Sequence, residues 1–331
     1  MKIITESMVE KHLTMPDCIS AMREAMISVS KGETTLPIRQ YIPIPQTNGK
    51  MALMPGTIAN PECYGIKLVC KYNRPIGDPH GTHVGMVLVF DSQKGLPLAM
   101  IEGASLTAIR TAAASAMATD ILANKKVDIL TIMGYGEQAR RHIISMLAVR
   151  SFKNIFVWGR SFKKALAFTE RMKTETGANI TAISGAEEAV ANSDIICTTT
   201  SSPTPILMGD WVKAGTHINL VGAAIKSNTE VDESLVTKSR YFTDYRPAAM
   251  AAAGELLNAI NSKSITKAHI LAEIGDVAAG DKPGRLSKDD ITIYKSLGVA
   301  AQDLAAGHKL YHLARYQGFG IDVEMMDVPR I

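Results

Sequence analysis

The stretch Val127-Asp-Ile-Leu-Thr-Ile-Met133, followed at once by Gly134-Tyr-Gly-Glu-Gln-Ala139, decides the fold of this chain. An apolar run rich in β-branched residues leads into a G-x-G-x-x-A turn, and residues 140–149 favour a helix. A strand, a tight glycine turn and a helix in this order are the context that a dinucleotide-binding fingerprint requires. The pattern therefore predicts a dinucleotide site, with glycines that serve packing alone as the alternative.

Each small residue of this turn has its own role in such a fingerprint. Gly134 permits the sharp turn, Gly136 lets the backbone approach a pyrophosphate, and Ala139 keeps the helix close to the sheet. The free N–H groups at the helix N-terminus attract the phosphates. The predicted cofactor contacts of the turn are Gly134, Tyr135, Gly136, Glu137, Gln138 and Ala139.

The end of the next strand indicates which nicotinamide cofactor binds. Strand 154–158 leads into Gly159, Arg160 and Ser161, with no carboxylate at the tip. NAD sites usually place an Asp or Glu there, whereas an arginine accommodates the 2′-phosphate of NADP. We therefore predict contacts from these three residues and favour NADP(H) over NAD(H), with a solvated basic turn as the alternative.

Strands and helices continue to alternate beyond this point. This alternation is typical of an α/β fold with a Rossmann-like, doubly wound parallel sheet. Strands are predicted at 127–133, 154–158, 179–183, 194–199, 216–221 and 239–243, and helices at 137–149, 161–175 and 186–191.

The N-terminal part has a different pattern. Thr14-Met-Pro-Asp17 starts a helix that ends near Gly32, and short β-type runs at 40–44, 50–54, 64–70 and 84–90 predict an antiparallel sheet. A helix at 105–123 follows, and beyond Lys288 the chain becomes helical again, over 299–316. We predict a discontinuous α+β outer domain, 1–120 plus 300–331, into which a dinucleotide domain, 121–299, is inserted.

Composition excludes several classes of protein. The net charge of +4 includes no basic run of the kind that binds nucleic acid, and no apolar stretch approaches the roughly 20 residues that span a bilayer. The N-terminus has no signal-peptide pattern, and the four cysteines show no metal-ligand spacing. We expect a cytoplasmic protein with reduced thiols, no metal, no nucleic-acid partner and no membrane partner.

Two further motifs are Thr107-Ala-Ile-Arg-Thr-Ala-Ala-Ala-Ser115 and Lys295-Ser-Leu-Gly-Val-Ala-Ala-Gln-Asp303. Together with the glycine fingerprint and the N-terminal sheet domain, they resemble the ornithine cyclodeaminase/μ-crystallin family. This family also contains alanine dehydrogenases and ketimine reductases. The resemblance covers almost the whole chain and implies a homodimer built through the outer domain.

Three cations are candidates for binding a substrate carboxylate, which needs clustered donors. They are Arg39 before a strand, Lys67 in Tyr64-Gly-Ile-Lys67, and Arg110 in the T-A-x-R-T-A motif. Each alone would more often be a solvated surface cation. The resemblance implies that all three hold the carboxylate of an amino- or imino-acid substrate.

Two departures from the family pattern concern the reaction. Ornithine cyclodeaminases carry a Glu before the L-M-P motif and an Asp after the paired glycines of the fifth strand. Ala52 and Ala223 stand at these positions here. Alanine can neither accept a proton nor pair with an ammonium group, so cyclodeaminase activity is not expected.

The remaining parts suit hydride transfer to a C=N carbon next to a carboxylate. Lys67 is the candidate catalytic proton donor to the imine nitrogen, because a buried lysine between cations can titrate near neutrality. The alternative is that Lys67 only holds the carboxylate while the imine arrives protonated. His80 and His83, on a predicted polar turn, are the alternative candidates for the proton donor.

The resemblance also adds contacts outside the fingerprint. Gly298, beside Leu297, is expected to contact the substrate. The additional cofactor contacts expected are Thr82, Arg110, Thr111, Thr198, Thr199, Val221, Gly222, Ala223 and Leu297.

The leading hypothesis is NAD(P)H-dependent reduction of a cyclic ketimine, 1-pyrroline-2-carboxylate or 1-piperideine-2-carboxylate, to L-proline or L-pipecolate. The alternatives are an L-alanine-type dehydrogenase and a cyclodeaminase- or hydroxyproline dehydratase-type lyase with bound NAD. A protein that only binds NADPH and a hydrophobic hormone is a fourth possibility, which the three cations argue against.

Overall fold

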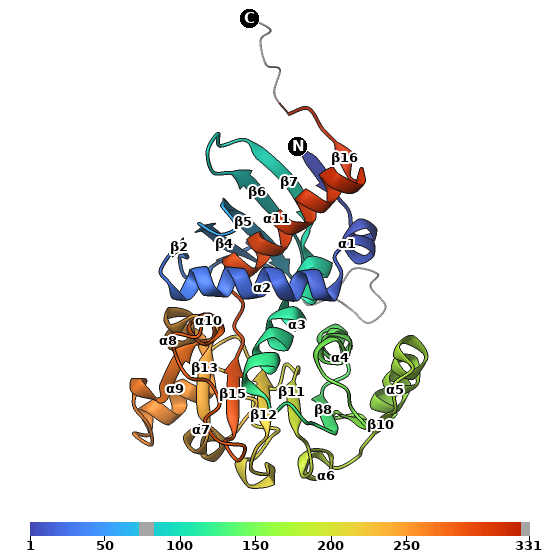
Figure 1. Ribbon diagram of the computed structural model, residues 1–331, viewed down its shortest axis with the longest axis vertical. Coiled ribbons are helices and arrows are strands. Elements are labelled where there is room, and N and C mark those ends of the chain that lie inside the picture. Colours follow the sequence, from blue (N-terminus) through green and yellow to red (C-terminus); the bar gives the residue numbers. More distant parts are fainter. Residues whose placement is uncertain (73–82, 326–331) are drawn as a thin grey trace, which may run out of the picture. The chain divides into compact units, whose positions relative to one another are not determined.

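The computed structural model describes residues 1–72 and 83–325, and its chain divides into two compact units (Figure 1). The first unit comprises Met1–Arg110 and Val299–Ile331, and the second comprises Thr111–Gly298. The borders predicted from the sequence lie at 120 and 300. Helix α3, Gly103–Leu122, continues through the first border, which is why no break in the sequence pattern marks that point.

The second unit contains one sheet of parallel strands, all of whose residues are described. The strand order is β10-β9-β8-β11-β12-β15-β13-β14, and each pair of neighbouring strands is parallel. Strands β9 and β10 extend the sheet on one side of β8, and β11 and β12 extend it on the other. The order therefore reverses between β8 and β11, which confirms the doubly wound fold. The strands are β8 Ile129–Met133, β9 Asn154–Trp158, β10 Ile180–Ala182, β11 Ile195–Thr198, β12 His217–Leu220, β13 Arg240–Thr243, β14 Ile270–Glu273 and β15 Thr292–Lys295.

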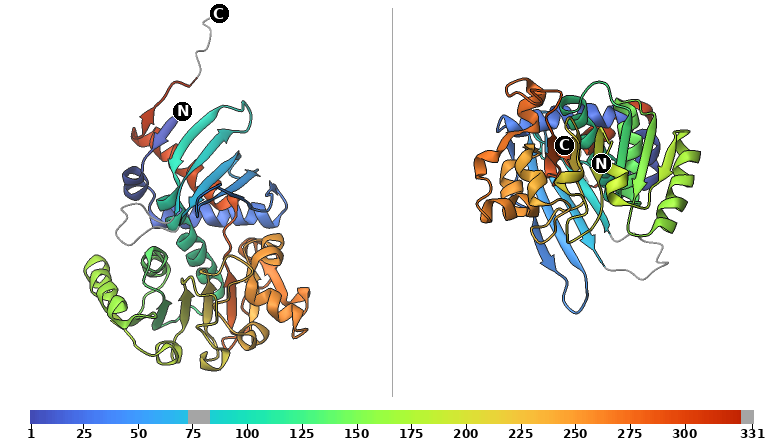
Figure 2. Two further views of the ribbon diagram at one scale, coloured as in Figure 1. Left: turned by 180° about the vertical axis from the view of Figure 1, so that it is seen from behind. Right: turned by 90° about the horizontal axis from the view of Figure 1, so that it is seen from below.

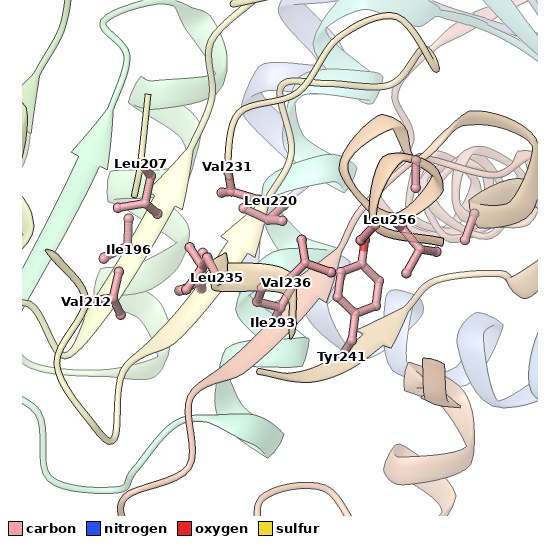
Figure 3. Close-up of a cluster of buried hydrophobic side chains, with 14 of the residues drawn as sticks. Ile196, Leu207, Val212, Leu220, Val231, Leu235, Val236, Tyr241, Leu256 and Ile293 are labelled. Carbon is pink, nitrogen blue, oxygen red and sulfur yellow. The ribbon is translucent and has the colours of Figure 1, made fainter. Parts of the chain in front are cut away.

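Helices cover this sheet, and the inner strands β11, β12 and β15 are accordingly buried along their whole length. Figure 3 shows Leu220 of β12, Ile293 of β15 and Tyr241 of β13 packed with Leu235 and Leu256 of the covering helices. The helices of this unit are α4 Glu137–Val149, α5 Phe162–Thr176, α6 Ala186–Val190, α7 Glu233–Lys238, α8 Arg246–Ala252, α9 Gly254–Asn261 and α10 Ile274–Ala279, with 3₁₀ turns at Gly209–Trp211 and Lys267–His269.

The sequence prediction was wrong about where this sheet ends. Strands β14 and β15 follow residue 243, and β15 lies inside the sheet, between β12 and β13. Strand β15 has the short sequence Thr-Ile-Tyr-Lys and ends in a lysine, so its sequence looks like that of an exposed segment. Lys295 is nevertheless fully buried, because Glu255 of α9 lies 2.9 Å from its Nζ and compensates its charge.

The first unit is built around a second sheet, with order β16-β1-β7-β6-β5-β4-β2 among the described residues and with β3 paired to β4. The predicted antiparallel pairing holds from β3 to β6. Strand β7, which was not predicted, continues it by pairing antiparallel with β6. The parallel pair of β1 with β7 was not predicted. The strands are β1 Lys2–Ile4, β2 Thr34–Thr35, β3 Gln40–Pro43, β4 Lys50–Ile58, β5 Cys63–Lys71, β6 His83–Asp91, β7 Pro97–Glu102 and β16 Ile321–Asp322.

Helices α2, Met15–Ser30, and α11, Ala300–Gln317, pack together, and α11 runs across one face of this sheet (Figures 1 and 2). Thr14 caps α2 by accepting the N–H of Asp17, as its sequence predicts. A Cβ on Gly307 of α11 would come within 3.0 Å of Ile101 and Val89, so this glycine lets the helix lie close to the sheet. Helix α1, Glu6–His12, completes the unit.

Candidate functional site

A buried ionic cluster in the first unit joins two of the predicted cations. Lys67 on β5 and Arg110 on α3 are 4% and 3% exposed. Both contact the same carboxylate oxygen: Lys67 Nζ lies 3.1 Å and Arg110 Nε 2.9 Å from Asp303 Oδ1. Asp303 itself is fully buried in the first turn of α11. Three distant segments of the chain therefore meet at one charged point.

The elements around the cluster explain why it is buried. Lys67 pairs in register with Met54 on β4 and Val87 on β6, both of which are buried. Arg110 also donates from Nη1 to Gln302 Oε1 at 2.6 Å. The cluster is thus held from a strand, from α3 and from two successive residues of α11.

The charges around Lys67 set its protonation. Burial lowers the pKa of Lys67 from 10.5 to about 7, with Asp303 opposing this shift and the positive charges of Arg110 and Arg39 adding to it. Burial acts to raise the pKa of Asp303, but Arg110 and Lys67 outweigh it and hold that pKa below its ordinary value. An ionised Asp303 therefore lies beside a lysine that exchanges its proton near neutral pH.

Arg39, the third predicted cation, precedes β3 and donates to the hydroxyl of Tyr41 at 3.2 Å. Its positive charge adds to the lowering of the pKa of Lys67, after the larger effects of burial and of Arg110. Asp303 and Gln302 were not predicted as site residues. A signal for Asp303 was present, because two buried cations need a counter-charge and this aspartate ends the segment quoted above.

The glycine turn of the second unit has the backbone that the fingerprint requires. Gly134 has φ +132°, and a Cβ there would lie 2.5 Å from Thr199 Oγ1. The turn is fixed by Gly134 N–H, which donates to the carbonyl of Trp158 at 2.8 Å, and by Thr199 N–H, which donates to that of Met133 at 2.9 Å. Glycine is therefore required at 134 by conformation and by space.

The N-terminus of α4 is open to a ligand. Gly136 is its N-cap residue and makes no side-chain cap, and a Cβ on Gly136 would meet no heavy atom within 4 Å. Within the described chain, Gln138 Oε1 is buried without a hydrogen-bond partner, while Ala139 is fully buried against the sheet. Uncapped N–H groups and free space beside them fit a pyrophosphate.

The remaining predicted cofactor residues lie at the end of β9 and in the glycine turn, and most of them contact other residues of the chain. A Cβ on Gly159 would overlap the ring of Tyr135, so the ring lies over the end of β9. Arg160 is exposed, and Ser161 caps α5 by accepting the N–H of Lys164 at 3.4 Å. Glu137 forms ion pairs with arginines 140 and 141 of its own helix.

The ends of β11 and β12 lie side by side in the sheet. Val221 and Gly222 donate their N–H groups to the carbonyl of Thr198, at 3.1 and 3.2 Å. The hydroxyl of Thr198 donates to Glu230 Oε2 at 2.7 Å, and Ala223 N–H donates to the same oxygen at 3.2 Å. Glu230, a buried carboxylate, was not predicted from the sequence.

The last predicted residues of the second unit are at its two borders. The N–H groups of Leu297 and Gly298 both donate to Asp244 Oδ2 at 2.7 Å, and Thr111 is buried on α3. Thr82 and His80 lie outside the described residues, and His83 begins β6.

Residues 1–72 and 83–325 contain no group of three or more His, Cys, Asp or Glu side chains suited to a metal ion. Within the same ranges, no helix is both long enough and apolar enough to cross a bilayer.

Comparison with known proteins places these sites in context. The model of the ornithine cyclodeaminase/mu-crystallin family matches residues 1–317. Mouse ketimine reductase mu-crystallin is 34% identical over 296 residues, which cover 88% of this chain and 90% of the mouse protein.

Two solved structures are similar over nearly the whole chain. The Δ(1)-pyrroline-2-carboxylate reductase of Thermococcus litoralis, in complex with NADH and L-proline, has a TM-score of 0.92 and 32% identity, covering 98% of this chain and 100% of that one. An archaeal alanine dehydrogenase dimer with bound NAD has a TM-score of 0.90 and 28% identity, covering 98% and 99%.

Proposed function

The chain belongs to the ornithine cyclodeaminase/mu-crystallin family, and we propose that it reduces a cyclic ketimine carboxylate with NAD(P)H. The substrate is 1-pyrroline-2-carboxylate or 1-piperideine-2-carboxylate, and the product is L-proline or L-pipecolate. The observation that carries this proposal is the buried cluster of Lys67, Arg110 and Asp303. The relatives that are reductases of cyclic imines support it.

The cluster suits both needs of an imine substrate. Arg110 and Arg39 provide permanent positive charge for the substrate carboxylate. Reduction of C=N also requires a proton on nitrogen, and Lys67 can supply one because burial lowers its pKa to about 7. Asp303 fixes the position of Nζ through the 3.1 Å contact.

A bound nicotinamide would supply the hydride that adds to the imine carbon. The turn from Gly134 to Ala139 would hold the pyrophosphate through the open N-terminus of α4. The ends of β11 and β12, with Leu297, would hold the rest of the cofactor, while Gly298 would contact the substrate.

The residues that cyclodeaminases use are absent here. Ala52 and Ala223 are both buried and apolar, so no carboxylate is available at either position for a substrate amine. This argues for net reduction with exchange of the cofactor and against internal cyclisation of a diamine.

A parallel assay tests the reaction. Purified protein is mixed with NADPH or NADH and with 1-pyrroline-2-carboxylate, 1-piperideine-2-carboxylate, or pyruvate plus ammonia, and the absorbance of reduced nicotinamide is followed. Oxidation with a cyclic imine is the expected result. Oxidation only with pyruvate and ammonia would instead identify an alanine-type dehydrogenase, and no oxidation in any mixture would contradict both reductase activities.

NADP(H) is the cofactor that Arg160 favours, since its exposed guanidinium can pair with a 2′-phosphate. Replacing Arg160 by aspartate should remove charge-assisted hydrogen bonds worth about 1.5–3 kcal/mol and lower the NADPH-to-NADH ratio of kcat/KM by roughly 10- to 100-fold. Arg171→Asp, the same charge change on exposed α5 surface, is the control. An unchanged ratio in Arg160→Asp would refute the preference for NADP.

We further propose a homodimer that forms through the sheet of the first unit. Val87 and Val89 of β6 lie beside Gly307 of α11, so the alternate residues of the sheet's strands face away from that helix. On this other face, apolar residues continue across three strands, in rows such as Leu53, Leu68 and Met86. Met86 is 38% exposed. An extended apolar face of this kind marks an interaction surface, and the similar alanine dehydrogenase is a dimer.

A charge on this face should separate the two copies. Met86→Asp is expected to shift the mass measured by light scattering after size exclusion from dimer to monomer, because the carboxylate would be buried without a partner. Leu286→Asp, at a residue 68% exposed in the second unit, should leave the mass unchanged. A dimeric Met86→Asp variant, or a monomeric parent protein, would contradict the proposed interface.

A further inference from the structure

A single carboxylate joins the two segments that follow β11 and β12. Glu230 is 1% exposed and accepts five hydrogen bonds. Its Oε1 accepts the N–H and the hydroxyl of Thr200, both at 2.8 Å. Its Oε2 accepts the hydroxyl of Thr198 at 2.7 Å and the N–H groups of Gly222 and Ala223 at 2.8 and 3.2 Å. One oxygen thus serves Thr200 while the other serves Thr198 and the segment after β12.

The two segments approach each other so closely that only glycine fits at position 222. A Cβ on Gly222 would overlap the carbonyl oxygen of Thr200 and lie 2.5 Å from Glu230 Oε1. The peptide that follows is held from a second direction, because Lys295 Nζ donates to the carbonyl of Ala223 at 2.6 Å. Ala223 is therefore fixed at its N–H by a buried anion and at its carbonyl by a buried cation.

The ionised form of Glu230 fits these contacts. Three of the five donors are backbone N–H groups, which can only donate. Burial raises the pKa of Glu230, while the hydrogen bond from Thr198 and the charge of Lys295 oppose this shift. The nearby ammonium group and the array of donors replace the water that the carboxylate loses.

The place of Glu230 in the sheet indicates which part of the cofactor it serves. A doubly wound sheet binds a dinucleotide across the switch point, with one nucleotide on each half. The half formed by β8, β9 and β10 carries the glycine turn and Arg160, which suit the pyrophosphate and the adenosine end. The ends of β11 and β12 are left for the nicotinamide half.

We propose that Glu230 is a positioning residue that shapes the nicotinamide-binding half of the cofactor site by tying the segments after β11 and β12 to each other. This inference rests on the proposed function, because it requires a bound dinucleotide. Glu230 acts through Thr198, Gly222 and Ala223, which are the cofactor contacts expected from the sequence.

Glutamine at this position tests the proposal because it keeps the size of the side chain and removes one acceptor. Its amide NH₂ must face either Thr200 N–H or the N–H groups of Gly222 and Ala223, and donors facing donors push that segment away. Glu230→Gln should therefore displace one of the two segments while the turn at 134–139 stays intact.

The experiment compares two probes by calorimetry: NADPH, and 2′,5′-ADP, which lacks the nicotinamide half. For Glu230→Gln we expect NADPH to bind at least about tenfold more weakly and kcat to fall on the order of 100-fold, because small misplacements are costly in catalysis. The Kd of 2′,5′-ADP should stay within about twofold. Glu187→Gln, at an exposed glutamate of α6, should change none of these values.

Other outcomes have distinct meanings. Equal weakening of both probes would show that Glu230 supports the unit as a whole, and unchanged binding of both with unchanged kcat would show that it positions nothing; either result overturns the proposal. If the parent protein binds neither NADPH nor NADH, the proposed function has failed instead; if it binds NADH alone, NADH and ADP replace the two probes in the same comparison.

A milder variant covers the case in which Glu230→Gln does not fold. Thr200→Val removes the hydroxyl hydrogen bond to Glu230 Oε1, together with the one that this hydroxyl accepts from Ser202 N–H, and leaves the carboxylate in place. It should weaken NADPH binding severalfold with no effect on 2′,5′-ADP. Equal effects on the two probes would again contradict the proposal.

Discussion

Replacing Asp303 by asparagine is expected to lower the free energy of unfolding by about 3–5 kcal/mol, the usual cost of removing one partner from a buried ion pair. The amide has nearly the shape of the carboxylate but no charge. Lys67 and Arg110 would then lie side by side in the interior without the anion that both contact. Arg110 would keep a buried charge without its counter-charge, and Lys67, whose pKa Asp303 no longer holds up, would have to lose its proton on folding. Both effects oppose folding.

Urea unfolding measures this loss, at one fixed protein concentration because a dimer couples stability to concentration. Asp322→Asn is the matched control, since Asp322 also forms an ion pair, with Lys2 at 2.8 Å, but is 80% exposed. Exposed pairs contribute about 0–1 kcal/mol, so the control should be nearly neutral. Equal losses in the two variants would show that the buried cluster is not a stabilising element of the fold.

The local parts of this molecule were predictable from its sequence. The strand, glycine turn and helix from 129 to 149 each follow from neighbouring residues: β-branched residues, a glycine that must take a positive φ, and a helical run. The boundaries of α4 and β9 are those predicted. Interactions between residues that are close in the sequence determine where such strands, turns and helices form. A single sequence is therefore enough to predict them.

The missing parts all depend on partners in other elements of the fold. Strand β15 was missed because Lys295 looks solvated until Glu255 of α9 is placed beside it. Glu230 and Asp303 are ordinary carboxylates in the sequence, and their roles come from donors supplied by other elements. The hydrophobic periodicity of a sequence does not indicate which buried charged residues pair with each other. These pairs form only when the chain has folded.

Lys67 should control the pH dependence of turnover. Its pKa is lowered to about 7, so the ammonium form that can donate a proton predominates below pH 7 and is lost above it. If Lys67 is the acid, kcat/KM for the imine is expected to be level at lower pH and to fall about tenfold per pH unit well above pH 7, because kcat/KM reports the pKa of the free enzyme. Stopped assays with saturating NADPH and varied cyclic imine across pH 5.5–9.5, on the order of one pH value per half unit, give the profile.

Two substitutions at Lys67 separate proton donation from carboxylate binding. Lys67→Met removes both and should lower kcat by about 10²–10⁴-fold, while Lys71→Met, at the exposed end of the same strand, should have little effect. Lys67→Arg keeps the positive charge but does not give up its proton near neutral pH. It should retain substrate affinity better than Lys67→Met, yet still turn over slowly and lose the decline above pH 7. If the decline persists in Lys67→Arg, the titrating group is the imine itself, and Lys67 serves only to hold the carboxylate.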